Sequence, residues 1–256
     1  MRQLVTFTKK EFVELQRTNK LLVLGIVFLL FGIMNPAIAK LTPWLMETMA
    51  NELESSGIFV KEVVVTALDS WMQFFKNIPM AVIVFVLMFS GILTNEYQKG
   101  TLINMVTKGL SRWKIIVSKL IVMLAAWSIG YWMCFGITYV YNEYYWDNSI
   151  AKNLLPSVFV IYILGIWFTT MIILFSSIFR TNSSVAIMTA VVFGVMYVLS
   201  MVPDIEKYLP VKLMDASSMP MGVGAPEDFV TALIITGIWS IINIFAGIKC
   251  FNKKNL

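Results

Sequence analysis

Six apolar stretches of roughly membrane-spanning length restrict the folds open to this chain more than any other feature. They cover residues 21–39, 79–94, 115–140, 155–178, 185–202 and 229–248. A helix of about 20 apolar residues crosses the hydrocarbon core of a bilayer, and a helix satisfies its own backbone hydrogen bonds there. The stretches take up roughly half of the 256 residues, which leaves no room for a separate soluble domain. We therefore predict an all-α polytopic membrane protein in which residues 1–256 form one transmembrane domain.

Composition agrees with that class and excludes several others. Hydrophobic residues make up 58% of the chain, whereas soluble domains have about 45–50%. The net charge of +5 does not indicate nucleic-acid binding, because the basic residues lie beside predicted helix ends, where anionic lipid headgroups lie. The absence of histidine removes the commonest metal ligand and the usual general base. Cys134 and Cys250 fall at different membrane levels. We expect no catalytic residue, no metal site and no disulfide.

The basic residues sort by membrane side. With the N-terminus inside, the predicted cytoplasmic segments hold 14 of the 20 basic residues and 3 of the 15 acidic residues. Lysine and arginine favour cytoplasmic loops, and this bias sets orientation. We therefore predict cytoplasmic termini, with residues 40–78 and 203–228 outside. A basic start, an apolar run and Ala37-Ile38-Ala39 are also typical of a cleaved secretory signal. Because a helical pattern over residues 2–18 precedes the run, we predict a true first span.

Residues 1–20 are predicted to form a cytoplasmic helix that lies on the membrane surface. At about 100° per residue, five positions gather within about one quadrant, namely Leu4, Val5, Thr8, Phe12 and Leu15. Most charged positions fall on the opposite arc, and basic amphipathic helices lie in the headgroup plane. The alternative is a loosely ordered cytoplasmic tail.

The two long extracellular segments differ in character. Residues 40–78 carry many aromatic and apolar side chains among acids, which predicts one or two short helices on the outer membrane surface. Residues 203–228 hold four of the eight prolines and two glycines, which break long helices. Because this segment also contains many apolar residues, we predict that it re-enters the membrane between spans five and six, covered by protein.

The predicted spans hold no acidic or basic residue apart from Lys119 near a cytoplasmic end. Proton-coupled carriers usually need titratable groups inside the membrane. The chain also lacks a G-x-x-x-x-G-K-[ST] loop to bind nucleotide phosphates. If such a protein works on a substrate, its energy comes from another chain. Neutral oxygens in the spans leave sodium coupling open.

The cytoplasmic loop at 95–114 has the pattern of a docking element for such a partner. Thr101 is a suitable N-cap for a short helix that runs to Lys108. Gly109 suits the left-handed position that ends this helix, and Ser111 suits the N-cap of the third span. The result is a stub of about two turns with basic and apolar side chains. The alternative is a connector that lies on the membrane surface.

Several residues of this loop resemble the corresponding loop of ABC-2 type permeases, the membrane subunits of many bacterial ABC exporters. The resemblance rests on Glu96-x-x-x-Gly100-Thr101 followed by Lys108, Ser111-Arg112 and Lys119. It extends over nearly the whole chain, because such proteins also have an amphipathic cytoplasmic helix, six spans and a re-entrant segment between the last two.

The resemblance implies an ATP-driven exporter permease in a bacterial plasma membrane. It implies a second permease subunit, identical or different, and cytosolic ATPase subunits that bind ATP and Mg²⁺, so that this chain itself binds no cofactor. The residues implied in coupling to the ATPase are Phe12, Glu96, Lys99, Gly100, Thr101, Met105, Lys108, Gly109, Ser111 and Arg112. The residues implied in the translocation path are Val82, Phe85, Phe89, Ile92, Thr189, Phe193, Met196 and Ser200.

The uncharged spans favour an amphipathic or hydrophobic cargo, such as a peptide toxin, an antimicrobial peptide or a drug. Both stripes of path residues are also compatible with ordinary helix packing. Two other functions stay open from the sequence. One is a non-energised membrane protein (a channel, a sensor or an assembly factor), which needs no nucleotide-hydrolysing partner. The other is a sodium-extruding ABC permease.

Overall fold

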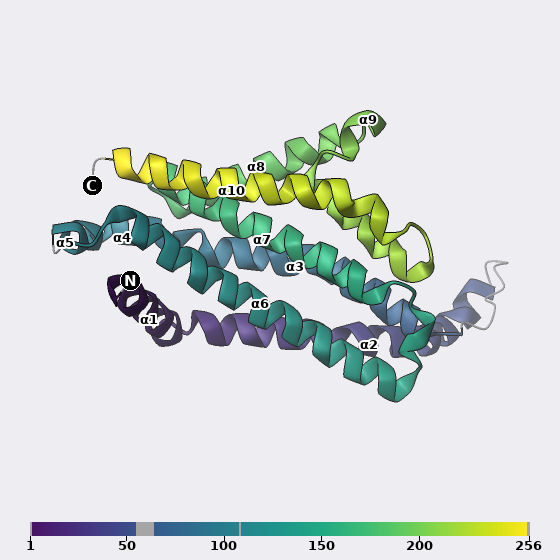
Figure 1. Ribbon diagram of the computed structural model, residues 1–256. Coiled ribbons are helices and arrows are strands. Elements are labelled where there is room, and N and C mark those ends of the chain that lie inside the picture. The colour runs from purple at the N-terminus through teal and green to yellow at the C-terminus, as the bar shows by residue number, and fades with distance from the viewer. Residues whose placement is uncertain (1, 55–63, 108, 255–256) are drawn as a thin grey trace.

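The computed structural model describes residues 2–54, 64–107 and 109–254. These residues form helices and no strand, and the long helices run side by side along one axis (Figure 1). Both termini lie at one end of this bundle, together with α1 (Arg2–Arg17), α4 (Gly91–Gln98) and α5 (Thr101–Thr107). We call this end the inner end, since the sequence predicts that it faces the cytoplasm, and the opposite end the outer end.

Six segments of the described chain have the length and composition of membrane spans, as predicted. They cover Lys20–Met49, Ala67–Gln98, Arg112–Tyr145, Leu154–Ile178, Asn182–Leu199 and Pro226–Lys253. The corresponding helices are α2 (Lys20–Glu54), α3 (Ala67–Phe89) followed by α4, α6 (Arg112–Tyr145), α7 (Leu154–Ile178), α8 (Asn182–Leu199), and η3 (Pro226–Phe229) followed by α10 (Val230–Lys253). The prediction of an all-helical, multi-pass membrane protein is confirmed.

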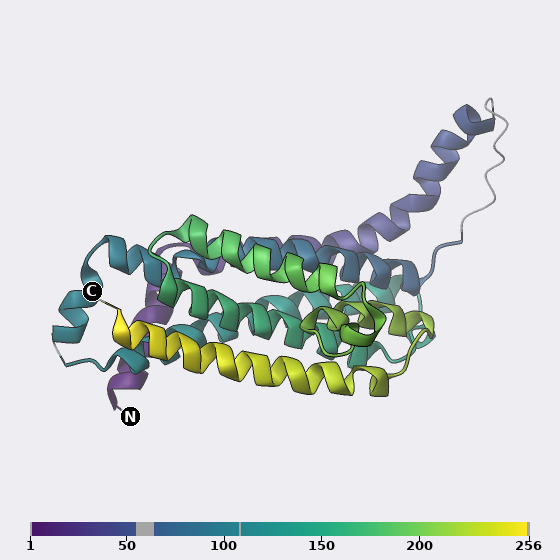
Figure 2. The same cartoon turned by 90° about the horizontal axis from the view of Figure 1, so that it is seen from above.

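The prediction of short surface helices within residues 40–78 is wrong where the structure describes this segment. Residues 40–54 continue α2, whose end extends beyond the other helices (Figure 2), and residues 67–78 form the first half of α3. Residues 55–63 lie outside the described part of the chain. Proline does not stop these helices, since Pro36 and Pro43 lie inside α2 and Pro79 lies inside α3. Membrane helices tolerate interior proline where neighbouring groups satisfy the freed carbonyls.

Residues 203–228 fold back onto the bundle as a series of short turns. They comprise α9 (Pro203–Glu206), η2 (Pro210–Met221) and η3. Leu213 and Met219 of η2 are fully buried, and the hydroxyl of Ser157 in α7 donates a hydrogen bond to the carbonyl oxygen of Ala216. The segment therefore packs against the spans. The re-entrant interpretation concerns its depth in a bilayer and stays a prediction.

An aromatic core holds α3, α6 and α7 together. Trp71, Trp127 and Tyr131 are fully buried. The indole N–H of Trp71 donates to Asn148 Oδ1 of η1 (Asn148–Ile150) at 3.0 Å, and the hydroxyl of Tyr131 donates to the carbonyl oxygen of Val158 at 2.7 Å. Buried aromatic rings with a polar atom are stable when that atom finds a partner, so these contacts fix the rotation of each helix.

Neutral polar side chains join α2 to the same core. The amide of Asn77 in α3 donates to Asn35 Oδ1 of α2 at 2.7 Å, and the amide of Asn35 donates to Thr138 Oγ1 of α6 at 2.9 Å. Asn35 and Thr138 are fully buried. Hydrogen bonds of this kind connect helices in an environment without water.

Helix α8 is the span that its own chain covers least. Its buried residues are Val185 and Thr189. Its exposed side carries Ile187, Val191, Val195 and Val198. This surface is suited to contact with lipid or with another apolar helix.

Gly165 of α7 provides a test of the aromatic core, because a residue without a side chain at this position lets the indole of Trp127 lie directly against α7. A Cβ atom at Gly165 would overlap that indole, whereas one at Gly237 of α10 would meet nothing within 4 Å. Overpacking costs about 1–3 kcal/mol, so we expect Gly165→Ala to lower the melting temperature of the purified protein by several degrees. Gly237→Ala is the matched control and keeps or raises it, because alanine favours helix. Equal melting temperatures for the two variants would contradict this account of the core.

Candidate functional site

Five charged residues from three helices meet at the inner end, and we call them the ion cluster. They are Lys10, Glu11 and Glu14 of α1, Glu96 of α4 and Lys119 of α6. Lys119 Nζ lies 2.8 Å from Glu11 Oε2 and 3.1 Å from Glu96 Oε1. Lys10 Nζ lies 3.0 Å from Glu11 Oε1, 3.3 Å from Glu96 Oε1 and 2.6 Å from Glu14 Oε2. Ion pairs therefore join α1 to both α4 and α6.

The centre of the ion cluster is buried. The side chains of Lys119, Glu11 and Glu96 are 1%, 3% and 7% exposed. Charges in such places persist only when paired, and removal of one partner is strongly destabilising. Among the described residues Glu96 Oε2 has no hydrogen-bond partner, so this carboxylate depends on the contacts of its other oxygen.

The outer part of the ion cluster is charged at neutral pH. Partial burial opposes the charge of Lys10, but its hydrogen bond to Glu14 and the charges of Glu11 and Glu96 outweigh that effect and raise the pKa of Lys10. Partial burial also acts against ionised Glu14, but the hydrogen bond from Lys10 together with the charges of Lys10, Lys119 and Lys20 outweighs it and lowers the pKa of Glu14. Oxygens of Glu11, Glu14 and Glu96 come within 4.8 Å of one another, but lysine ammonium groups already contact all three carboxylates. The arrangement is an ion-pair network rather than a cation site.

The face that helix α1 presents to the bundle coincides only partly with the predicted apolar stripe, with which it shares Leu15. Its buried residues are Phe7, Glu11 and Leu15, which follow one another at intervals of four. Val5, which belongs to the predicted stripe, is 67% exposed, and Phe12 is partly buried against the core. A hydrophobicity pattern cannot place a buried glutamate, because the partner that permits burial lies in another helix. That α1 lies in the headgroup plane stays a prediction.

The predicted stub is present as α5, between two glycines in the left-handed region. Gly100 has φ 64° and Gly109 has φ 84°. The N–H of Gly109 donates to the carbonyl oxygen of Val106 at 3.0 Å, and the N–H of Leu110 donates to that of Met105 at 3.2 Å. This pair of bonds is the Schellman arrangement that ends helices at glycine, so the predicted role of Gly109 in the turn is confirmed. Lys108 lies outside the described residues.

The stub has a buried and an exposed side. Leu102 is 1% exposed, whereas Ile103 is 46% exposed. Ser111 is the N-cap of α6, but its side chain makes no capping hydrogen bond. Of the residues implied in coupling, Lys99, Gly109 and Ser111 are exposed, Phe12, Gly100, Thr101, Met105 and Arg112 are partly buried, and Glu96 is buried. Lys99, Gly109 and Ser111 therefore lie on the surface, whereas Glu96 lies in the interior.

Arg112 contacts its own chain. Its Nη1 donates to the carbonyl oxygens of Phe251 and Asn252, each at 3.0 Å, and of Lys254 at 2.7 Å. The last carbonyl groups of a helix have no partner inside it, so Arg112 at the start of α6 caps the end of α10. The loop that the sequence predicts to receive the ATPase is thus attached to the sixth span.

Lys254 extends this attachment to α7, and sequence reasoning missed it. Its Nζ donates to the carbonyl oxygens of Ser177 at 3.2 Å and Phe179 at 2.8 Å, and it lies 3.9 Å from the centroid of the Tyr97 ring. Burial and the nearby charge of Arg180 lower the pKa of Lys254 to about 8. Because cations favour helix C-termini, Lys254 could have been expected to cap a helix. The helix that it caps, α7, lies far away in sequence and could not be identified from the sequence.

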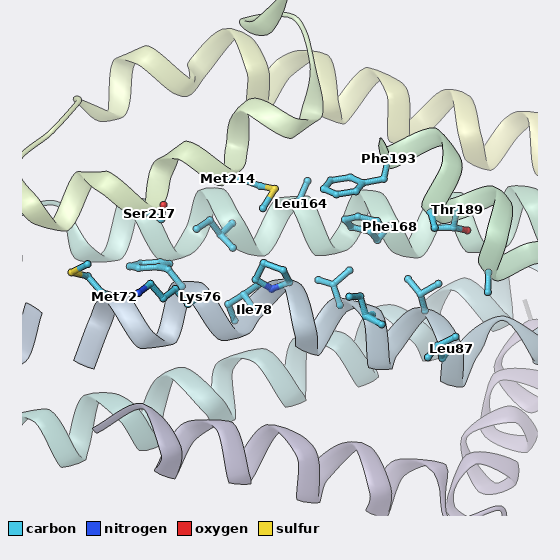
Figure 3. Close-up of a pocket in the computed structure, with 18 of the residues that line it drawn as sticks. Met72, Lys76, Ile78, Leu87, Leu164, Phe168, Thr189, Phe193, Met214 and Ser217 are labelled. Carbon is cyan, nitrogen blue, oxygen red and sulfur yellow. The ribbon is translucent and has the colours of Figure 1, made fainter. Parts of the chain in front are cut away.

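A groove of about 520 Å³ runs between α3, α7, α8 and η2 (Figure 3). Among the predicted path residues, Val82, Thr189 and Phe193 line it. The other wall residues of α3 include Ile83 and Val86. The groove thus includes both helices that the resemblance assigned to the path, α3 and α8, together with α7 and η2.

The remaining predicted path residues do not line the groove. The rings of Phe85 and Phe89 pack on each other with centroids 4.5 Å apart, and Phe85 packs on Trp127 at 5.4 Å. Ile92 is buried in α4, and Met196 and Ser200 lie outside the lining. Aromatic rings gain by packing on other rings, so the side of α3 that carries Phe85 faces α6, whereas the side that faces the groove is mainly aliphatic.

The ion cluster leads to a stability prediction. Lys119→Met removes the buried cation and leaves the carboxylates of Glu11 and Glu96 only the partly exposed Lys10, and we expect a loss of about 3 kcal/mol in the free energy of unfolding. Adding Glu96→Gln to this variant recovers part of the loss, because Lys10 then has one buried carboxylate fewer to neutralise. Lys114→Met is the control, since Lys114 contacts exposed Gln3. A Lys119→Met protein with wild-type stability would rule out the role assigned to the cluster.

Lys254 leads to a prediction about pH. Because its pKa is lowered to about 8 in the folded protein and is about 10.4 in an unfolded chain, the folded state binds fewer protons between these values. Stability from this group therefore rises as pH increases through that window. We expect the melting temperature of wild type to rise relative to that of Lys254→Met from about pH 7.5 to about pH 9.5, a range that contains the lowered pKa. Lys253→Met serves as an exposed control, and a pH-independent difference for Lys254→Met would refute the assignment.

Residues 5–256 match the family described as "ABC-2 family transporter protein". The chain is also similar to a protein described as "Uncharacterized transmembrane protein YxlG" from Bacillus subtilis (strain 168). The two are 22% identical over 235 residues, which cover 90% of this chain and 89% of that protein. The family match spans nearly the whole chain and agrees with six helical spans. It is consistent with a permease that is itself not an enzyme. The chain belongs to the ABC-2 transporter family of membrane proteins.

Proposed function

We propose that this chain is the permease subunit of an ATP-driven exporter, with ATP and Mg²⁺ bound by a separate cytosolic ATPase. The observation that carries the proposal is the combination of an exposed stub, α5, with a buried ion cluster directly behind it. The stub begins five residues after Glu96, and Thr101 Oγ1 donates to the carbonyl oxygen of Glu96 at 3.4 Å. Movement of α5 therefore acts first on Glu96.

The ion cluster supplies the next step. Glu96 contacts Lys119 of α6, and Lys119 contacts Glu11 of α1. Ion pairs in a dry environment resist separation, so a push on α5 moves α1 and the inner half of α6 together. The ATPase docks on the exposed side of α5, which carries Ile103 and Asn104, and on exposed Lys99 just before this helix. The cytoplasmic orientation of this end follows from the distribution of basic residues.

A second permease subunit completes the transporter in this proposal. The exposed aliphatic side of α8 and the groove beside it supply a surface on which a second copy, or a related chain, encloses a path between the two subunits. The groove lining is apolar with few polar groups, which favours an amphipathic or hydrophobic cargo such as a peptide toxin, an antimicrobial peptide or a drug. Export, rather than uptake, follows from the resemblance to exporter permeases.

The test replaces a surface residue of the stub, because replacing buried Glu96 would mix loss of fold with loss of coupling. Ile103 is 46% exposed on α5 and Ile150 is 44% exposed on η1 at the outer end. We expect Ile103→Asp to lower permease-stimulated ATP hydrolysis by about tenfold in proteoliposomes that contain the ATPase. This change corresponds to a loss of about 1.4 kcal/mol in the free energy of docking. Ile150→Asp is the matched control and keeps the rate.

Two results would contradict the proposal. One is an unchanged rate for Ile103→Asp at equal permease content. The other is a wild-type chain that does not stimulate ATP hydrolysis by any ATPase encoded next to it. A non-energised channel, sensor or assembly factor would behave in this way.

A further inference from the structure

The groove between α3, α7, α8 and η2 has polar groups at one end and an apolar body. Lys76 is its one charged lining residue within the described chain, and Ser217 of η2 lies near it (Figure 3). Lys76 is exposed and makes no ion pair with any described residue, and the hydroxyl of Ser217 makes no hydrogen bond there. Thr189, a polar residue nearer the other end, already donates to the carbonyl oxygen of Val185 at 2.8 Å. Unpaired polar groups therefore gather at the Lys76 end.

The shape of the groove suits one long hydrocarbon chain. From Lys76, its wall on α3 continues to Leu87, which corresponds to about 16.5 Å of helix axis. An extended hydrocarbon advances roughly 1.3 Å per carbon, given a C–C bond of about 1.52 Å, so about thirteen carbons match this length. Its volume of about 520 Å³ lies within the usual range for ligand sites, about 300–1,000 Å³.

The position of Lys76 limits which kinds of molecule can bind in the groove. A neutral apolar molecule would leave Lys76 without a counter-ion, and a cationic peptide would bring like charge against it. An anionic phospholipid supplies both an acyl chain for the apolar body and a phosphate for the ammonium and hydroxyl groups. Because α3 enters from the outer end and Lys76 lies in its first three turns, the headgroup would lie on the outer side.

We propose that this groove binds an anionic phospholipid of the outer leaflet, with one acyl chain along α3 and its phosphate at Lys76 and Ser217. The inference does not require the transport function proposed above, because it concerns the chain alone. The lipid would fill the groove whenever cargo is absent and would support η2 and α8 against α3.

The experiment measures lipid retention by the purified chain without an ATPase. Phosphatidylglycerol and phosphatidylcholine with identical acyl chains are added in detergent, and bound lipid is counted by native mass spectrometry. We expect wild type to retain phosphatidylglycerol about fivefold better, which corresponds to about 1 kcal/mol. Lys76→Gln loses that preference and Lys76→Arg keeps it. Lys207→Gln, which removes another exposed lysine near the outer end, is the matched control and keeps it.

A second variant tests the acyl-chain part of the site. Val86→Trp places a large ring in the groove, and we expect retention of both lipids to fall. Thermal unfolding checks that each variant is folded, and a misfolded Val86→Trp is replaced by Ile83→Trp, from the exposed rim. Equal retention of the two lipids by wild type would overturn the proposal, as would equal losses in Lys76→Gln and Lys207→Gln. It is also overturned if the groove-filling variant abolishes dimers but leaves lipid retention unchanged, since the occupant is then a second copy.

Discussion

The contact on which the inner end depends is the ammonium group of Lys119 between two buried carboxylates. Lys119 lies in α6, Glu11 in α1 and Glu96 in α4, so three segments far apart in sequence share one cation. A short N-terminal helix has little apolar surface with which to hold its place. Desolvated charges have few acceptable positions, so this contact defines where α1 lies. It also defines where the connector α5 begins, because only a few residues separate Glu96 from Thr101.

The two ends of the bundle are held by different physics. At the inner end, ion pairs and lysine or arginine bonds to helix carbonyls link α1, α4, α6, α7 and α10. Toward the outer end, the links are aromatic packing and hydrogen bonds between neutral groups, such as Asn35 with Thr138. Charged links are geometrically restrictive, whereas apolar contacts allow small displacements. In the transporter proposed above, these charged links would carry a push on α5 to α1 and α6, while the outer half would be freer to rearrange.

The sequence was sufficient for the features that depend on local chemistry. The six spans follow from runs of apolar residues, and the end of α5 follows from Gly109, since few other residues adopt positive φ. The features that sequence reasoning missed depend on partners distant in the chain. Sequence reasoning gave Glu11 no role, because its partner Lys119 lies in another helix, and it placed Phe85 in the translocation path, whereas the Phe85 ring packs on Trp127.

The cap that Arg112 places on α10 constrains the order in which the protein matures. Arg112 precedes Phe251 by 139 positions. During synthesis, α7 and α8 are therefore made before the carbonyl oxygens at the end of α10, which accept the hydrogen bonds of Arg112, exist. Membrane proteins made in this way acquire their early helices first. The ion pairs of α1 with α6 form within that early portion, whereas the bond from Arg112 closes only once α10 is in place. The start of α6 therefore gains these contacts only after the sixth span has been made.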